Sequence, residues 1–142
     1  MENGAWSISG MLSWLRDETN ADFAAIALME EHEQRMRWQY ASGNRNERYK
    51  KIIFSRKGMI GNVLRSGRLM MIPSFFPKSG DDPSEYAILL AEGLKSAVAV
   101  PVMHEESICG VLLVGCRQIR VFTEELSKIV SAAEWLGDTL RS

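Results

Sequence analysis

The two ends of the chain carry apolar residues at helical spacing. In residues 1–20 these positions are Trp6, Ile8, Met11, Leu12 and Leu15. In residues 122–142 they are Leu126, Ile129, Val130, Ala133, Leu136, Gly137 and Leu140. We expect Thr123 to cap the second helix, with Glu124 and Glu125 in its first turn, where the helix dipole favours acids. Both patterns predict amphipathic helices, and the first is expected to pack on the second or on a partner protein.

Between these helices, two pairs of short apolar runs predict two β-hairpins. Residues 22–29 form the first strand, and residues 35–40 alternate as the second strand after the charged turn at 30–34. The side chains expected on one face of that second strand are Met36, Trp38 and Tyr40. The other hairpin consists of residues 97–103 and 108–116, and we expect it at the centre of the sheet.

Shorter elements are predicted between the two hairpins. Residues 51–55 have a weak strand pattern, and residues 59–66 have the pattern of a short helix that Gly67 closes in the left-handed conformation. A strand at 69–72 stops at Pro73. The order of helix, hairpin, mixed segment, hairpin and helix predicts an α+β fold, with a central antiparallel sheet and helices gathered around it.

A helix-start signal lies at Asp82–Glu85. The aspartate can cap, the proline after it suits the first helical position, and the glutamate completes the spacing of a capping box. The predicted helix spans residues 83–92 and ends at Gly93. The body of this helix is apolar on nearly all sides. We therefore expect it to be covered on both sides and to form one wall of a binding site.

Basic residues are concentrated in one stretch of a chain that is nearly neutral overall, with seventeen basic and eighteen acidic residues. The basic residues between positions 45 and 68 are Arg45, Arg48, Lys50, Lys51, Arg56, Lys57, Arg65 and Arg68. Only one acid, Glu47, stands among them. The stretch contains the glycine-bordered helix start Gly58–Gly61, and helix N-termini are suited to receive anions. A solvated surface is the simpler explanation of the charges.

Length and composition describe one ordinary globular domain spanning residues 1–142, with 46% hydrophobic residues. The N-terminus lacks the basic start and long apolar run of a secretory signal, and the apolar stretches are too short to span a bilayer. Cys109 and Cys116 lie seven positions apart in one predicted strand, so alternation sends them to opposite faces and no disulfide is expected. A reducing cytoplasm is the simplest location.

Several segments together resemble the GAF domain family. They are Asp22–Leu28, Lys57–Arg68, Ser96–Val102, Ile108–Gly115 and Phe122–Glu125. The resemblance covers essentially the whole chain and implies a PAS-like fold. In that fold the N- and C-terminal helices pack on one side of the antiparallel sheet, and short helices wall a ligand pocket on the other side.

The segment Arg37–Lys50 is similar to bacterial nitrate receptors of the NreA type. This resemblance implies a non-enzymatic regulatory protein that binds nitrate, needs no further cofactor and acts on the sensor histidine kinase of a two-component system. It also implies the nitrate-binding residues, which are Trp38 as the aromatic donor, the backbone amides of Met59 and Ile60, and the helix residues Tyr86 and Ile88. Where that family has an alanine, this chain has Ile60, which narrows the cavity by several heavy atoms.

The residues themselves are compatible with nitrate. Nitrate is small, planar and singly charged, so a few neutral donors can hold it without an ion pair. Each candidate also has a structural explanation, since Trp38 can be a core residue and Tyr86 can bury its ring with one backbone partner. For the basic stretch at 45–68, an electrostatic funnel and a kinase docking patch are both open, and we favour the docking patch.

Other functions known for GAF domains find less support in the same residues. A free methionine-R-sulfoxide reductase of the GAF type uses three cysteines, whereas this chain has two. The residue set of cyclic-nucleotide GAF domains is absent, and His32 and His104 fall in predicted turns without metal-ligand spacing. Nucleic-acid binding is not expected, because the rest of the chain is acidic. Tryptophans in the terminal helices leave a homodimer or a pure dimerisation module open.

Overall fold

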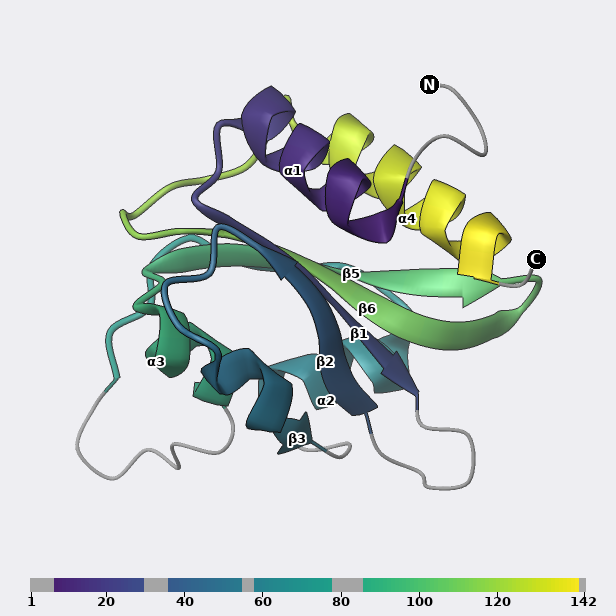
Figure 1. The fold of residues 1–142 in the computed structure, drawn as a ribbon, viewed down its shortest axis with the longest axis horizontal. Helices are drawn as coiled ribbons and strands as arrows, with labels where there is room; N and C mark the ends of the chain where they lie inside the picture. Colours follow the sequence, from purple (N-terminus) through teal and green to yellow (C-terminus); the bar gives the residue numbers. More distant parts are fainter. Residues whose placement is uncertain (1–6, 30–35, 55–57, 78–85, 141–142) are drawn as a thin grey trace.

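The strands of the described chain lie in one antiparallel sheet, and helices cover both of its faces (Figure 1). The structure is a computed structural model and describes residues 7–29, 36–54, 58–77 and 86–140. In order across the sheet, the strands are β3 (Ile53–Phe54), β2 (Met36–Ser42), β1 (Phe23–Met29), β6 (Ser107–Cys116), β5 (Ser96–His104) and β4 (Met70–Ile72). The helices are α1 (Ile8–Thr19), the 3-10 turn η1 (Arg48–Lys51), α2 (Gly58–Ser66), α3 (Ala87–Glu92) and α4 (Leu126–Leu140). The predicted α+β fold and both hairpins are confirmed.

Helices α1 and α4 lie side by side on one face of the sheet, which we call the α1–α4 face (Figure 1). Ser7 caps α1 by accepting a hydrogen bond from the Gly10 backbone N–H at 2.9 Å, and Asn20 ends the helix in the left-handed conformation. The N-terminal helix therefore packs on the C-terminal one, as one of the two expected arrangements. Trp6 lies outside the described residues.

The start of α4 differs from the prediction. The helix begins at Leu126, so Glu124 and Glu125 precede its first turn instead of occupying it. The Glu125 carboxylate accepts a hydrogen bond from the Thr123 backbone N–H at 3.2 Å and pairs with Arg120 at 3.3 Å. The glutamate side chain thus folds back over the turn, and the expected capping of the helix by Thr123 is wrong.

A bulge in the β5–β6 hairpin corrects the expectation for the two cysteines. Val102 pairs with Gly110 and Met103 with Ile108, so Cys109 is an extra residue in β6. The bulge reverses the alternation, and Cys109 and Cys116 both pack on the α1–α4 face. The prediction of opposite faces is wrong. Both thiols are free, as expected.

A second bulge explains the position of Tyr40. Ala27 of β1 pairs with Trp38, while its neighbour Ile26 pairs with Tyr40, so Gln39 is the extra residue in β2. Met36 and Trp38 are each 1% exposed, but Tyr40 is 38% exposed. The prediction that all three side chains share one buried face is therefore wrong for Tyr40.

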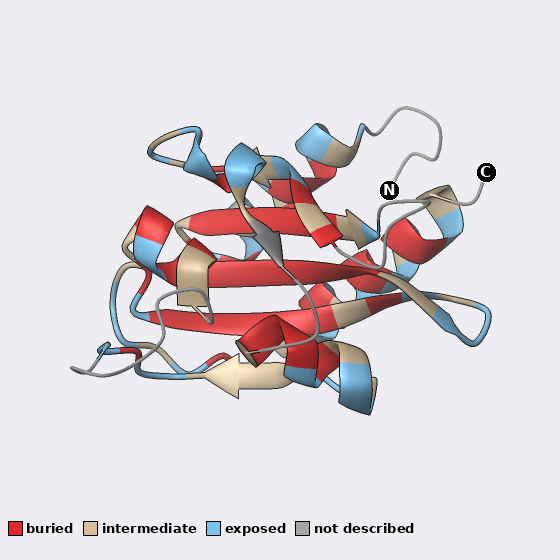
Figure 2. Cartoon of the chain, turned by 90° about the horizontal axis from the view of Figure 1, so that it is seen from below, coloured by how far each residue is buried: buried red, intermediate tan, exposed pale blue. Residues whose placement is uncertain are grey.

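The opposite face, which we call the α2–α3 face, is covered by short elements. Figure 2 views the molecule from this side and shows central strands that are buried over most of their length, although only short pieces cross them. Helix α2 ends as predicted at Gly67, whose φ is 68° and whose N–H donates to the Val63 carbonyl. Of the weak strand predicted at 51–55, Ile53 and Phe54 form β3, whereas Lys51 ends η1 and Ser55 lies outside the described residues.

Helix α3 begins later than the sequence pattern predicts. Its first residue is Ala87, and Tyr86 occupies the N-cap position. The capping signal at Asp82–Glu85 lies outside the described residues, as does the charged turn at 30–34. The C-terminal end matches the prediction, because Gly93 adopts the left-handed conformation with φ 65°.

Candidate functional site

The residues expected to hold a ligand come together in one buried cluster on the α2–α3 face. Trp38 is 1% exposed, Met59 3%, Ile60 5% and Ile88 3%, and the half-buried Tyr86 packs against the same cluster. They derive from three elements that are far apart in the sequence, namely β2, α2 and the start of α3. The structure thus brings all five candidates together, and it does so in the layer opposite α1 and α4.

The sheet presents small side chains to this cluster. Ala25 and Ala27 of β1 and Ala97 and Ala99 of β5 all face it and are buried. This layer of small methyl groups leaves room for bulky side chains packed against it, and Trp38 belongs to the same cluster as Met36, two positions earlier in β2. The indole nitrogen Nε1 has no exposure to solvent. Trp38 is therefore a donor-bearing aromatic residue in an otherwise apolar layer.

The N-terminal turn of α2 enters the same layer. Gly58 begins the helix with φ 78°, and Met59 and Ile60 follow with buried side chains. The first N–H groups of an α-helix have no intrahelical acceptor, and they carry the positive end of the helix dipole. No acidic residue lies in the first turn of α2 to neutralise this end. These features suit an anion better than a cation.

An aromatic pair forms the remaining side of the cluster. Tyr86 contacts Phe75, with the ring centroids 5.0 Å apart and the planes inclined by 40°. Phe75 is 9% exposed and belongs to the cluster, although sequence reasoning did not select it. It lies between Pro73 and Pro77 in a segment without helix or strand, and a buried aromatic in such a segment has no periodic signal.

The basic residues of the stretch 45–68 lie on the surface. All those that the structure describes are exposed, namely Arg45, Arg48, Lys50, Lys51, Arg65 and Arg68. Arg56 and Lys57 lie outside the described residues. Lys50 pairs with Glu47 at 2.8 Å, and their contact lowers the pKa of the Glu47 carboxyl and raises the pKa of the Lys50 ammonium. These charges are outside the buried cluster.

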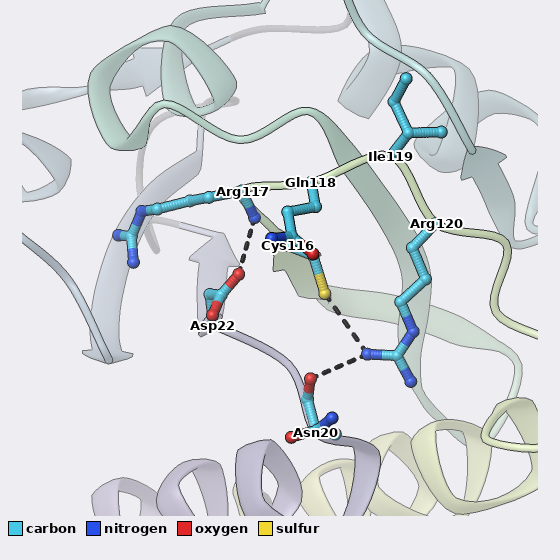
Figure 3. A pocket seen from close by; sticks show the side chains of 7 residues that line it. All are labelled: Asn20, Asp22, Cys116, Arg117, Gln118, Ile119 and Arg120. Atoms are coloured by element: carbon cyan, nitrogen blue, oxygen red, sulfur yellow. Dashed lines mark hydrogen bonds between the residues drawn. The ribbon is translucent and has the colours of Figure 1, made fainter.

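A separate polar hollow of about 520 Å³ lies where β6 leaves the sheet. Its lining residues are Asn20, Asp22, Cys116, Arg117, Gln118, Ile119 and Arg120 (Figure 3). The Arg120 guanidinium donates to the Asn20 carbonyl at 2.9 Å and to the Cys116 sulfur at 3.4 Å, while the Arg117 side chain points away. Because the charged groups are already paired with protein atoms, we assign no ligand to this hollow.

Metal centres and membrane spans each require a recognisable arrangement of residues. Within residues 7–29, 36–54, 58–77 and 86–140, no group of three or more His, Cys, Asp or Glu side chains is arranged to hold a metal ion. In those ranges no helix combines the length and the apolar character needed to cross a bilayer. The two cysteines lie on the α1–α4 face and not in the candidate site.

Comparisons with known proteins agree with this architecture. The family model of the GAF domain matches residues 8–132. Two structures of the Staphylococcus aureus NreA protein, mutated in its nitrate-binding site, are each 32% identical to this chain. The match to one of them covers 89% of this chain and 98% of the NreA chain, with a TM-score of 0.73. The match to the other covers 82% of this chain and 89% of the NreA chain, with a TM-score of 0.71.

A more distant structure shares the fold alone. The GAF domain of an Acinetobacter phosphoenolpyruvate-protein phosphotransferase is 22% identical, covers 95% of this chain and 80% of its own, and has a TM-score of 0.76. No curated protein matches the chain. The family model spans most of the described elements, including the sheet and the short helices of the α2–α3 face. The chain belongs to the GAF domain family.

Proposed function

We propose that this GAF domain senses a small oxyanion, with nitrate as the first candidate, in the cluster on the α2–α3 face. The observation that carries the proposal is the meeting of Trp38, the α2 N-terminus and the Tyr86 end of α3 in one buried layer. The similarity to NreA structures mutated in a nitrate-binding site supports nitrate over other anions.

The donors in this layer match the chemistry of nitrate. The Trp38 indole supplies one N–H, and the backbone amides of Met59 and Ile60 supply two more at the positive end of α2. All three donors are neutral, so the site binds a single negative charge without burying a cation beside it. Such a site avoids the desolvation cost of a buried ion pair. Tyr86 and Ile88 then form the wall that closes over the anion.

The regulatory target we propose is a sensor histidine kinase. The exposed basic residues between Arg45 and Arg68 form a surface beside the η1 and α2 elements. A partner with an acidic surface would be attracted to it, and such attraction weakens as salt is added. The charges lie outside the buried cluster, so partner binding and anion binding use different parts of the same stretch. Neither step requires a catalytic group.

Titration calorimetry tests the anion site. We expect nitrate to bind to the purified chain, nitrite to bind more weakly and chloride least, because planarity and three oxygens suit three donors. No heat of binding at millimolar nitrate would contradict the assignment.

A matched pair of substitutions tests the role of the indole. Trp38→Phe keeps an aromatic ring in the cluster but removes the N–H, and we expect at least a tenfold loss of nitrate affinity, the size of one hydrogen bond to a charged group. Trp14→Phe, on the α1–α4 face, is the control and should bind as the wild type does. If Trp38→Phe retains full affinity, Trp38 is a core residue only.

A further inference from the structure

Helix α3 is too short to be stable alone, yet its C-terminal end is completely hydrogen-bonded. It has six residues, and isolated helices of that length do not persist in water. The last four carbonyl groups of a helix lack intrahelical donors. Here each of them has one, from Leu94 N–H to Leu89, Gly93 N–H to Leu90, Asn46 Nδ2 to Ala91, and Arg117 Nε to Glu92. Among the described residues, the hydrogen bonds that hold α3 are therefore concentrated at this end.

The last residue of α3, Glu92, is a fully buried carboxylate with 0% exposure. Its Oε1 accepts hydrogen bonds from the Arg45 backbone N–H at 2.9 Å and from Arg117 Nη2 at 2.7 Å. Its Oε2 is buried and accepts no hydrogen bond from the described residues. A negative charge at a helix C-terminus opposes the dipole, and burial of a charge is costly. Local preference thus does not explain a glutamate here.

Arg117 connects this carboxylate directly to two other segments. Its backbone N–H donates to Asp22 Oδ2 at 2.7 Å at the start of β1, and its Nη2 also donates to the Gly43 carbonyl at 3.2 Å after β2. A Cβ on Gly43 would overlap the Asp22 carbonyl and the Arg16 side chain of α1. Arg16 also donates to the Ser42 hydroxyl at 2.9 Å. The network therefore runs from α3, through Arg117 and the end of β2, to α1.

The other end of α3 is held differently. Tyr86 occupies the N-cap position and makes no side-chain capping hydrogen bond. Its ring contacts Phe75, and Ile88 two residues later is buried in the candidate site. The helix is thus fixed by polar contacts at Glu92, and it presents its N-terminal end to the site through apolar contacts.

We propose that the buried Glu92 and the half-buried Arg117 form a clamp that positions α3 over the anion site and links that site to α1. Both are positioning residues, and neither contacts the anion. This proposal rests on the proposed function for its ligand, but the clamp itself is testable without one. When an anion changes the position of Tyr86, the rigid end at Glu92 transmits the change to Arg117 and Gly43, and from there to Arg16.

The test combines calorimetry with hydrogen exchange on the single variants Glu92→Gln and Arg117→Gln and on the double variant. We expect each single variant to lower nitrate affinity at least tenfold and to raise exchange in residues 86–94. The double variant should bind nitrate at least as tightly as the single variant with the lower affinity. The effects of removing two members of one interacting pair do not add. Arg117→Lys keeps the charge without the guanidinium fork and should fall between wild type and Arg117→Gln.

Two controls separate the clamp from general destabilisation. Glu18→Gln removes a surface ion pair with Lys128 on the α1–α4 face and should leave affinity and α3 exchange unchanged. Leu136→Ala destabilises the fold from the other side of the sheet through α4, outside the proposed link, and should leave affinity unchanged under conditions where the variant is folded. If Leu136→Ala weakens nitrate binding as much as Glu92→Gln does, the clamp has no specific role.

The outcomes distinguish the clamp from the anion site. If the wild type binds no nitrate, the proposed function fails, and faster exchange confined to residues 86–94 in Glu92→Gln still supports the clamp. Unchanged exchange in that segment overturns the clamp whether or not nitrate binds. The link to α1 predicts that nitrate slows exchange in α1 of the wild type and not of Arg117→Lys. Nitrate binding without any change in α1 overturns that link.

Discussion

The two faces of one sheet are covered in different ways. On the α1–α4 face, helices of twelve and fifteen residues lie side by side over a cluster of branched and aromatic side chains. On the α2–α3 face, helices of nine and six residues and a four-residue 3-10 turn cover a floor of alanines. Long amphipathic helices are stabilised by the area they bury, whereas short ones depend on specific contacts at their ends. The first face thus supports the fold, and the second is the one that a ligand could rearrange.

The largest effect is expected from a truncation on the α1–α4 face. Leu136 is 0% exposed in the middle of α4. Leu136→Ala should lower the free energy of unfolding by about 2–5 kcal/mol, through lost burial and a residual cavity. Urea denaturation measures this loss. Nitrate affinity of the folded protein should not change, and a parallel loss of affinity would contradict the separation of the two faces.

A glycine in the same helix gives the next largest effect. Gly137 lies so close to β5 that a Cβ would overlap the Met103 carbonyl oxygen. Glycine to alanine normally stabilises a helix by about 1 kcal/mol, but here we expect destabilisation by about 3 kcal/mol because backbone atoms must move. Ser131→Ala, at an exposed position of α4, is the control. The thermal unfolding midpoint should fall for Gly137→Ala, and it should rise or stay unchanged for Ser131→Ala.

A truncation on the α2–α3 face should behave differently. Ile60 is 5% exposed in the first turn of α2, where the resembling nitrate receptors have alanine. Ile60→Ala should lower the free energy of unfolding by about 2 kcal/mol, which is at the low end for the loss of a buried isoleucine. The same change should increase nitrate affinity, because it widens the site. Calorimetry and urea denaturation on one preparation give both values. If affinity falls together with stability, Ile60 contributes packing and does not restrict the site.

The smallest effect concerns the turn before α4. Hydrogen bonds from its own backbone N–H and from that of Thr123, together with the Arg120 guanidinium, hold the pKa of the Glu125 carboxyl below its ordinary value. A lowered folded-state pKa stabilises the fold above about pH 4.5, and the contribution is lost as the pH falls from there toward the folded-state pKa.

The corresponding variant is Glu125→Gln. It should be less stable than wild type by under 1 kcal/mol at pH 7, and the two should converge in acid. Denaturation midpoints at pH 7 and pH 3.5 measure the difference, with the exposed Glu124→Gln as the control. A stability difference between the two proteins that grows in acid would contradict the expected direction of the pH dependence.

The sequence predicted the elements whose signals are periodic or local. The terminal helices, both hairpins and the glycine ends of α2 and α3 were all found where apolar spacing or a glycine indicated them. The five candidate site residues also came together in one cluster, as the family resemblance implied. Binding of nitrate by that cluster stays a prediction.

Three errors have a common physical cause, because each depends on a contact that no local pattern encodes. The bulges at Gln39 and Cys109 insert one residue into a strand, and every later side chain then changes face. Thr123 does not take the N-cap position of α4, because the helix begins only at Leu126 and Glu125 directly precedes it. Phe75 and Glu92 were missed as well, since an irregular loop and a helix end acquire their roles only from distant partners.

The two outermost strands of the sheet have a consequence for the behaviour of the protein at high concentration. β3 has two residues and β4 has three, whereas the central β6 has ten. An edge strand can template the addition of another chain through its unpaired backbone groups, and the hazard grows with the length of the edge. Here the outermost strands are very short and pair with their neighbours at only two and three positions, while β1 and β6 are paired on both sides. Very short edge strands are one way in which natural sheets limit edge-to-edge aggregation, and lengthening β3 or β4 in an engineered variant would remove this feature.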